Sequence, residues 1–439
     1  MQRKIIQVEE RPPLAQGIPL SFQHLFAMFG ASILVPLLFG IQPGIVLLMN
    51  GIGTLIYILI TKGKAPAYLG SSFALISPVL LVMGGSQNAA TKFPLALGGF
   101  VVVGAIITIV ALIIWAFGTK WIDIILPPAA MGPIVALIGL TLAGTAASES
   151  KIPIMDTFAG NKVIYGGDWK NVTVFLITLL VAVFGSIMFR KFFAVIPILI
   201  AIVVGYISAC CFGLVDLSKI MSNGVFIAPN FQLPRFDLGA IAIIAPAALV
   251  IVTEHIGHQV VTSKIVGRDL IKDPGLHRTM ISDGISTMLS GFVGSVPTTT
   301  YGENIGVMAI TKVYSVWVIG GAAVISIIIA FFGPVSNIIS SIPGPVIGGV
   351  CFMLYGMIAA SGLRLLVEAK VDYSRSRNLA LTSVVFVTGL SGAFIPLSKN
   401  FLLSGLTLAT VVGMLLGLAF YAADKLKLTN DRDEPEEIK

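Results

Sequence analysis

The segment VIVTEHIGHQVV, residues 250–261, places one glutamate and two histidines inside an otherwise apolar run. On a helix, Glu254 and His258 are four residues apart and lie within about 40° of each other, whereas His255 points about 100° away from Glu254. A carboxylate and an imidazole on one face can hold N–H groups of a ligand or carry a proton. We therefore expect Glu254 and His258 to be functional, and His255 to serve packing or a hydrogen bond between helices.

The same residue types can bind a metal, but their spacing argues against it. The zincin pattern H-E-x-x-H has the glutamate between its histidines, whereas here the glutamate precedes both. Carboxylate-bridged sites use E-x-x-H motifs from more than one helix, and the chain has no pair of them. It also lacks the G-x-S-x-G nucleophile motif. We predict no metal, no cofactor and no enzymatic activity.

Composition predicts the environment of these residues. The 439 residues are 56% hydrophobic and 11% charged, against about 25% charged in ordinary soluble domains, and the mean hydropathy is +0.96. Apolar runs long enough to cross a bilayer recur from Pro19 to Ala422. The chain is therefore predicted to be an all-α polytopic protein of the lipid bilayer. The net charge of +7 is scattered over short loops, so we expect no nucleic-acid partner.

Runs and breaks predict fourteen membrane spans and their orientation. Most of the 28 Lys and Arg residues then fall on the side of the two termini. The positive-inside rule predicts that both termini are cytoplasmic. We expect the membrane to be the plasma membrane of a bacterium. The predicted spans are residues 18–39, 42–61, 66–84, 94–117, 121–145, 172–189, 192–213, 238–262, 277–295, 297–312, 315–341, 343–362, 379–396 and 401–422.

Three weak internal matches occur in the same order in both halves of the chain. They predict two repeats of seven spans, and because seven is odd the second repeat must be inverted. Inverted repeats form sites near the bilayer midplane, where broken helices meet. The matched pairs are FQHLFAMFG (22–30) with TEHIGHQVV (253–261), PAYLGSSFALISP (66–78) with VPTTTYGENIGVMAI (296–310), and PPAAMGP (127–133) with PGPVIGG (343–349).

Residues 66–73 and 297–304 break predicted spans 3 and 10. Both are rich in Pro, Gly, Ser, Thr and Tyr, which do not favour a continuous lipid-facing helix. Non-helical backbone at membrane depth survives only when it is buried in protein or lines a cavity. We expect two short extended segments that face each other, each followed by a half-helix whose free N–H groups point at a cavity. The alternative is that both are ordinary loops outside the membrane.

Ionisable residues within the spans are few, and each costs at least about 2.5 kcal/mol if it faces lipid at the bilayer centre. Glu254 and Glu303 are therefore predicted to form a pair that binds N–H donors and carries a proton. His258 would act as a relay or as a water-mediated contact. The alternative is that one of the two glutamates only ties helices together. Asp283 and His24 are expected to make tertiary contacts.

Several segments carry a family resemblance. They resemble uracil permeases of the nucleobase-ascorbate transporter family from span 1 through span 12, whereas the last two spans are similar only in hydrophobicity. ENIGVMAITK, residues 303–312, matches the signature of Gln, Glu or Pro followed by N-x-G-x-x-x-x-T-R/K. Glutamate at its first position is typical of the uracil branch, and glutamine of purine and xanthine members. The segments are SFQHLFAMFGASILVP, PAYLGSSFALISP, TEHIGHQVVTSKIVGRDLIKDPGLHR, GSVPTTTYGENIGVMAITKVYS and LYGMIAASGLRLLVEAKVDYSRSRN.

This resemblance implies a fourteen-span inverted-repeat fold, proton-coupled uracil uptake, alternating access between two domains, and a homodimer through the gate domains. The implied divisions are a tail at 1–17, a core domain of 18–117 and 238–341, a gate domain of 118–237 and 342–422, and a tail at 423–439.

The resemblance also implies a site. Uracil is flat and neutral, with two N–H donors and two carbonyl acceptors, so two carboxylates and two backbone N–H groups complement it. Phe73 or Tyr301 could cover a ring face. The implied contacts are the carboxylates of Glu254 and Glu303, the backbone at Phe73 and Gly302, His258 through water, and Tyr355 closing the site from the gate domain.

Two other functions remain open at this point. A xanthine or other purine permease would share the fold. An anion exchanger or channel would suit the half-helix N-termini, but two acidic side chains would repel an anion.

Overall fold

Helices make up most of the chain in the computed structural model, which describes residues 5–84, 89–156, 162–165, 167–190, 193–216, 224–398 and 401–429. Among these residues, eight helical segments are long and apolar enough to cross a membrane. They are α1 (Leu14–Phe39), α2 (Pro43–Ile60), α4 (Ala89–Phe117), α6 and α7 (Pro128–Thr141 and Ala143–Glu149), α8 (Trp169–Met188), α10 to α11 (Leu238–Ile244 and Ala248–Val266), α16 (Gly344–Glu368) and α18 (Gly405–Lys425).

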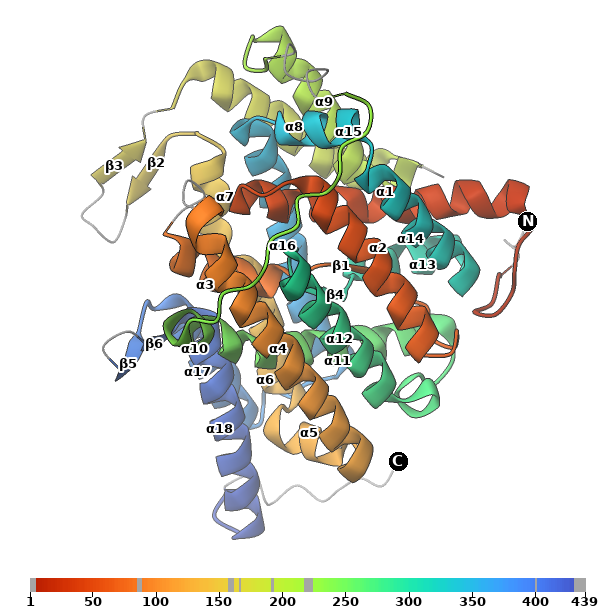
Figure 1. Cartoon of the computed structure of the whole chain (residues 1–439). Helices are drawn as coiled ribbons and strands as arrows, with labels where there is room; N and C mark the ends of the chain where they lie inside the picture. Colours follow the sequence, from red (N-terminus) through yellow and green to blue (C-terminus); the bar gives the residue numbers. More distant parts are fainter. Residues whose placement is uncertain are drawn as a thin grey trace.

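The remaining helices are shorter or, in the case of the 18-residue α12 (Leu276–Val293), less apolar. Three apolar ones have lengths between 10 and 17 residues: the 3₁₀ turn Phe73–Leu75 with α3 (Ile76–Met83), α9 (Pro197–Cys211) and α14 (Val316–Ala330). The others are α5 (Lys120–Ile125), α12 (Leu276–Val293), α13 (Gly302–Thr311), α15 (Gly333–Ser340) and α17 (Ser376–Leu390). Figure 1 shows α4, α12 and α2 side by side in the middle of the molecule.

Several predicted spans differ from the observed helices. The span predicted at 121–145 is divided between α5 and α6, because the chain breaks at Leu126 and Pro127. The span predicted at 315–341 is two helices, α14 and α15, because Gly333 and Pro334 start a new helix after Phe332. The span predicted at 379–396 ends as a helix at Leu390, and the chain continues into a hairpin of β5 (Phe394–Ser398) and β6 (Phe401–Ser404). Hydropathy did not separate these apolar strands from helix.

The two broken segments form a small sheet, as their composition predicts. β1 (Leu69–Ser71) pairs antiparallel with β4 (Thr298–Thr300), with Gly70 opposite Thr299. Two more backbone bonds extend the ladder, from Ser72 N to Pro297 O at 2.8 Å and from Tyr301 N to Tyr68 O at 3.1 Å. Both strands are fully buried. The alternative that both segments are ordinary loops is therefore wrong, since they pair as strands buried within the protein.

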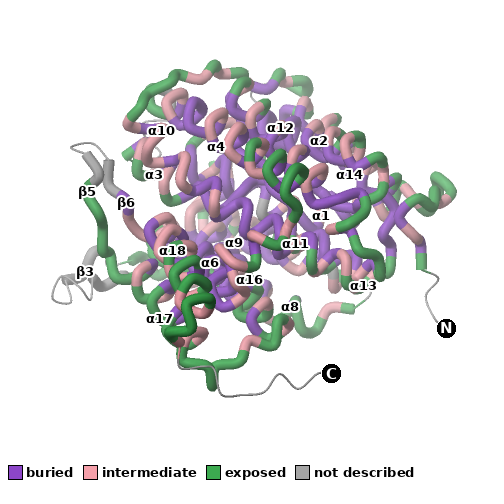
Figure 2. Tube along the Cα trace, turned by 90° about the horizontal axis from the view of Figure 1, so that it is seen from below, coloured by how far each residue is buried: buried purple, intermediate pink, exposed green. Residues whose placement is uncertain are grey.

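Helix pairs from distant parts of the chain build the interior. α4 packs along α12 and α2 along α14, while α6 packs along α16. The other main pairs are α8 with α9 and α17 with α18. Figure 2 shows the buried residues gathered in the interior, whereas α17 and α18 carry many exposed residues at the edge.

The outer surface is rich in large apolar side chains. Trp115 and Phe117 at the end of α4 are 68% and 79% exposed, and Ile187 on α8 is 76% exposed. A water-soluble monomer rarely exposes a continuous apolar surface of this kind. Such a surface is expected where helices face lipid.

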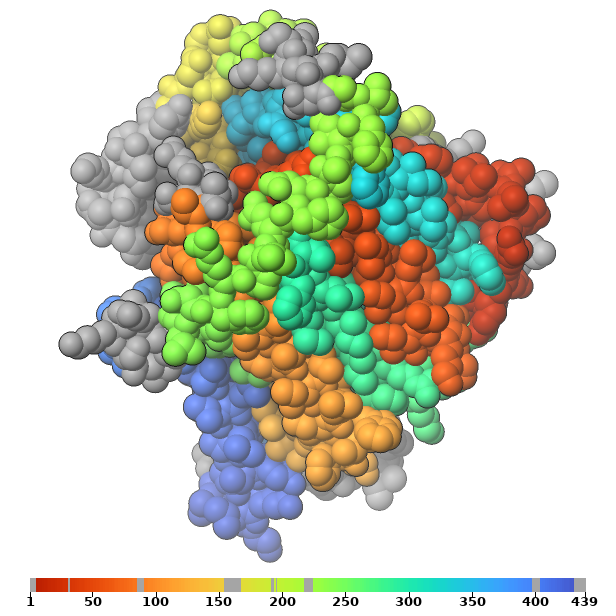
Figure 3. All heavy atoms as spheres, viewed as in Figure 1, coloured from red at the N-terminus to blue at the C-terminus, as the bar shows by residue number. Residues whose placement is uncertain are grey.

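The segment 224–237, between α9 and α10, lies across one face of the molecule as a strap (Figure 3). Its backbone donates hydrogen bonds from Arg235 N to Pro94 O at 2.8 Å and from Gln232 N to Val293 O at 3.2 Å. The strap therefore joins α4 to α12, the helix that packs against β4.

Candidate functional site

α11 lies against the break formed by β4 and α13, and it carries the polar residues singled out in the sequence. Nδ1 of His258 lies 3.0 Å from the hydroxyl oxygen of Thr300, the last residue of β4. A Cβ built on Gly302 would lie 3.4 Å from Nε2 of the same ring. His258 therefore spans the junction at which β4 ends and α13 begins.

The two predicted glutamates lie on helices that pack together at this junction, Glu254 on α11 and Glu303 on α13. Glu254 on α11 is 8% exposed and interacts electrostatically with Glu303, in the first turn of α13. Within the described chain, Oε2 of Glu254 has no hydrogen-bond partner. Glu303 and His258 are half-buried and Gly302 is exposed. Water therefore reaches the junction, and a carboxylate oxygen with free acceptor capacity lies beside it.

Two helix starts add N–H donors beside the carboxylates. α13 begins at Gly302 and the 3₁₀ turn begins at Phe73, and neither start has a side-chain cap. The first N–H groups of a helix have no partner within that helix and attract acceptors. The break thus presents acceptors from side chains and donors from the backbone.

Three aromatic side chains, Phe73, Tyr301 and Tyr355, lie together at the junction. The rings of Phe73 and Tyr301 are stacked, with centroids 6.3 Å apart and planes 8° apart. Tyr355 from α16 meets Phe73 edge-on at 6.1 Å. Tyr301 also interacts electrostatically with Glu303 and Glu254. The six residues predicted for the site are therefore brought around one junction by four separate segments of the chain, the 3₁₀ turn, α11, α13 and α16.

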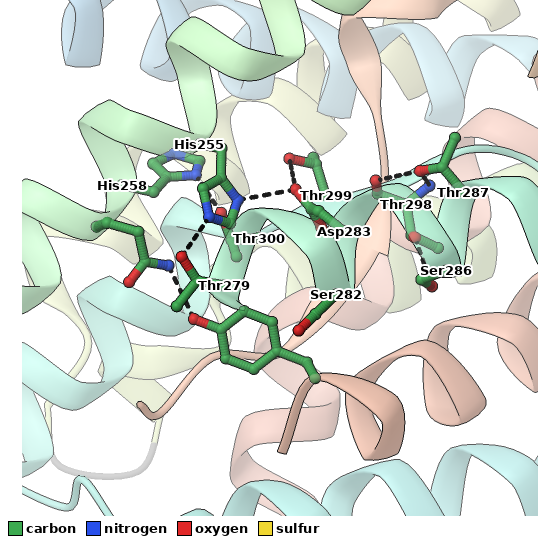
Figure 4. A network of polar contacts seen from close by, with 12 residues as sticks. His255, His258, Thr279, Ser282, Asp283, Ser286, Thr287, Thr298, Thr299 and Thr300 are labelled. Atoms are coloured by element: carbon green, nitrogen blue, oxygen red, sulfur yellow. Dashed lines mark hydrogen bonds and ion pairs between the residues drawn. The ribbon is translucent and has the colours of Figure 1, made fainter. Parts of the chain in front are cut away.

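His255 makes the contact between helices that its direction on α11 predicts. Its Nδ1 lies 2.9 Å from Oδ2 of Asp283 on α12, and its Nε2 lies 3.0 Å from the hydroxyl oxygen of Thr279 (Figure 4). Because the Thr279 hydroxyl donates to Leu276 O at 2.9 Å, it accepts a hydrogen bond from Nε2–H of His255. His255 and Asp283 are fully buried, so this pair fixes the rotation of α11 from behind the site.

His24 also makes a tertiary contact, as predicted. The side-chain amide of Asn304 donates to His24 O at 3.0 Å, and its Nδ2 lies 3.3 Å from Nδ1 of that histidine. α1 is therefore fastened to α13 one residue beyond Glu303. Asn304 had no role in the sequence interpretation, although the family signature contains it.

The threonines of β4 are positioning residues that the sequence interpretation missed. Thr298 donates to the Ser286 hydroxyl at 2.7 Å, Thr299 donates to Asp283 at 3.3 Å, and Thr300 contacts His258 (Figure 4). A run of three threonines in an apolar context signals extended backbone, but it does not say which helix each hydroxyl reaches.

Among the described residues, no group of three or more His, Cys, Asp or Glu side chains is placed so that it could hold a metal ion.

Comparison with known proteins decides the family. Residues 15–398 match the model of a permease family that includes xanthine and uracil permeases. The chain is 54% identical to a uracil permease of Paenibacillus larvae, over 98% of this chain and all of that protein. It is 51% identical to a uracil permease of Escherichia coli K12, over 100% and 97% of the two chains.

The chain belongs to this permease family. The resemblance expected from the sequence is confirmed, and the family consists of transporters rather than enzymes. With its apolar helices, this permease is a multi-pass membrane protein. A uracil permease of Bacillus subtilis is 46% identical over 94% of each chain.

Solved structures with a similar fold are much more distant in sequence. The transmembrane domain of the cyanobacterial bicarbonate transporter BicA superposes with a TM-score of 0.61 at 13% identity, over 94% of this chain and 98% of that one. The murine anion transporter Slc26a9 superposes with a TM-score of 0.71 at 10% identity, over 95% and 69%. At such identities the likeness concerns the fold alone.

Proposed function

We propose that this permease takes up uracil together with protons across the bacterial plasma membrane. The observation that carries the proposal is that Glu254 on α11 and Glu303 on α13 lie within electrostatic range of each other at a break in the helices. Relatives at 46% to 54% identity are named uracil permeases.

The chemistry of the junction complements uracil. The two ring N–H groups would donate to the carboxylates of Glu254 and Glu303. The two carbonyls would accept from backbone N–H groups at Phe73 and Gly302, where the helices start without side-chain caps. His258 would contact the ring through water, since it is half-buried beside Gly302.

The aromatic group would confine the ring. The stacked pair of Phe73 and Tyr301 offers an apolar surface beside the acids. Tyr355 reaches this pair from α16, so movement of that helix would open or close the site. A purine needs more room and a different pattern of donors and acceptors.

Proton coupling follows from the closeness of the two acids. Two carboxylates in a poorly hydrated site repel each other when both are ionised. A proton on one of them relieves the repulsion and leaves the other as an acceptor for uracil. Uracil and a proton would then bind to the site together. Release of one of them would weaken the binding of the other.

The helix contacts support an inverted repeat of fourteen spans. If α1 to α9 correspond to α11 to α18, then the pair α4–α12 corresponds to α14–α2, and α8–α9 corresponds to α17–α18. The pairs α6–α16 and β1–β4 would lie on the axis that relates the repeats. On this proposal the core domain is 18–117 with 238–341 and the gate domain is 118–237 with 342–422. Alternating access would move one against the other, within a homodimer formed by the gate domains.

Two rival functions meet different obstacles. Purine and xanthine permeases typically have glutamine at the position of Glu303. An anion exchanger would share the fold of the anion transporters described above, but Glu254 and Glu303 would repel its substrate.

Uptake of labelled uracil into proteoliposomes tests the proposal. With an inward proton gradient, uptake should exceed the level reached without it, and unlabelled uracil should compete better than xanthine. Uptake that ignores the proton gradient would refute the coupling. Preferential competition by xanthine, or chloride currents without nucleobase, would support one of the rivals instead.

A further inference from the structure

A cavity of about 660 Å³ lies outside the proposed transport site. It is enclosed by the segment before α1, the first turns of α1, the last turns of α2 and the first half of α14. Among its lining residues, Leu14 is 69% exposed, Ile18 50% and Trp317 55%. The cavity is therefore open on the outer surface of the helices.

The walls of the cavity are apolar. Leu14 and Ile18 on α1, Leu55 on α2 and Val324 on α14 line it, and all four are exposed. Glycines keep the cavity deep, since a Cβ on Gly320 would touch only Ile58 at 3.5 Å. The walls suit hydrocarbon chains and offer little to a polar solute.

The rim at one end is cationic. The guanidinium of Arg11 lies over the indole ring of Trp317, 5.0 Å from its centroid, and exposed Lys62 also lines the cavity. The acidic rim residue, Glu9, is paired with Arg268 at 2.5 Å. In the part of the chain that the structure describes, Arg11 and Lys62 have no carboxylate within 4 Å.

We propose that this cavity binds an anionic phospholipid from the leaflet on the side of the N-terminus. Its phosphate would lie against Arg11 and Lys62, and its acyl chains would lie along the apolar walls. Basic pockets between membrane helices bind anionic headgroups in this way, and a tryptophan at the rim is typical of the membrane interface. A zwitterionic headgroup carries its own positive charge beside the phosphate, which weakens its attraction to Arg11 and Lys62. Free phosphate has no acyl chains to lie along the apolar walls.

The bound lipid would stabilise the N-terminal segment. Ile6 and Val8 join the chain that follows α13, through hydrogen bonds from Tyr314 N to Ile6 O at 2.8 Å and from Val316 N to Val8 O at 2.9 Å. Arg11 follows three residues later. A lipid held by Arg11 would therefore clamp this segment onto the connection between α13 and α14, whatever the transported substrate is.

The test compares dioleoyl phosphatidylglycerol with dioleoyl phosphatidylcholine, added to the purified full-length protein in detergent. Thermal unfolding and native mass spectrometry report stability and retained lipid. Phosphatidylglycerol should raise the unfolding temperature by a few degrees more than phosphatidylcholine, because it binds only the folded state. The double variant that combines Arg11→Gln and Lys62→Gln should bind phosphatidylglycerol about 30-fold more weakly, because each basic residue near an anionic headgroup contributes a factor of roughly five.

Three controls keep the test decisive. Gly320→Leu fills the cavity without changing charge and should abolish retention of the lipid. Lys272→Gln, which removes an exposed lysine that does not line the cavity, should leave binding unchanged. Glycerol 1-phosphate, a headgroup without chains, should not stabilise the protein.

Equal stabilisation by both lipids, or undiminished retention of phosphatidylglycerol by the Gly320→Leu variant, would overturn the proposal. If the charge variant unfolds on purification, Gly320→Leu alone decides the matter.

Discussion

Gly70, in the middle of β1, lies against the ring of Tyr301, and one added carbon there tests how the site is assembled. A Cβ on residue 70 would lie 2.3 Å from Cε2 and 2.4 Å from Cζ of Tyr301. Favourable carbon–carbon contacts are about 3.5–4.0 Å long. In the Gly70→Ala variant, either the ring or the strand must therefore move by roughly 1 Å.

The ring of Tyr301 is not free to move. It stacks on Phe73, and its hydroxyl donates to Ser71 O at 3.0 Å. Overpacking of this kind costs about 1–3 kcal/mol. Because Phe73 and Gly302 flank the displaced groups, we expect that cost to fall on uracil binding, which would weaken by about 5- to 150-fold.

Isothermal titration of purified protein with uracil measures the loss, and thermal unfolding checks that the variant is folded. Gly144→Ala is the matched control, since a Cβ on this glycine of α7 would meet no atom within 4 Å. It should bind uracil as the unmodified protein does. If Gly70→Ala bound uracil with unchanged affinity and melted at the same temperature, the β1–β4 junction would not position the site.

Three further predictions follow from other contacts. His255→Leu leaves the buried Asp283 without its histidine, with only the Thr299 hydroxyl donating to it, and should destabilise the fold by about 3–5 kcal/mol, whereas the double variant with Asp283→Leu should recover most of this loss in a thermal melt. The hydrogen bond from Arg268 lowers the pKa of Glu9 below its ordinary value of 4.5, so this pair stabilises the fold above that value and the contribution is lost as the pH falls further. Because the pair is exposed, its contribution to stability should be below about 1 kcal/mol. Thermal melts between pH 3 and 6 should show this pH-dependent contribution in the unmodified protein and not in Arg268→Gln. An equal loss of stability at acid pH in both proteins would contradict the prediction. Tyr355→Ala removes the edge-on contact with Phe73 and should weaken uracil binding by roughly 2- to 10-fold, from about 0.5–1.5 kcal/mol for such an aromatic pair; unchanged titrations would exclude that role.

Local features of the sequence predicted the break and its acids. Residues 66–73 and 297–304 lack the composition of a lipid-facing helix, and the structure has strands β1 and β4 there. The four-residue spacing of Glu254 and His258 placed them on one face of α11, and His255 on another. Each of these inferences depends on only a few neighbouring residues, so it could be made without knowing any tertiary contact.

Contacts between distant segments could not be predicted in this way. No local pattern indicates that Gly70 lies under Tyr301, or that His255 pairs with Asp283 28 residues later. The ends of apolar runs were also uncertain, because hydropathy alone does not distinguish an apolar strand such as Phe394–Ser398 from the end of an apolar helix. The meeting of Tyr355 with Phe73 was known only through the family resemblance.

The affinity for uracil as a function of pH, in the unmodified protein and in Glu254→Gln and Glu303→Gln, tests the central claim most directly. The claim is that one proton shared by these two side chains governs uracil binding. We predict that the affinity of the unmodified protein changes with pH, and that each glutamine variant binds weakly and without this pH dependence. Glutamine variants that kept both the affinity and its pH profile would contradict the account.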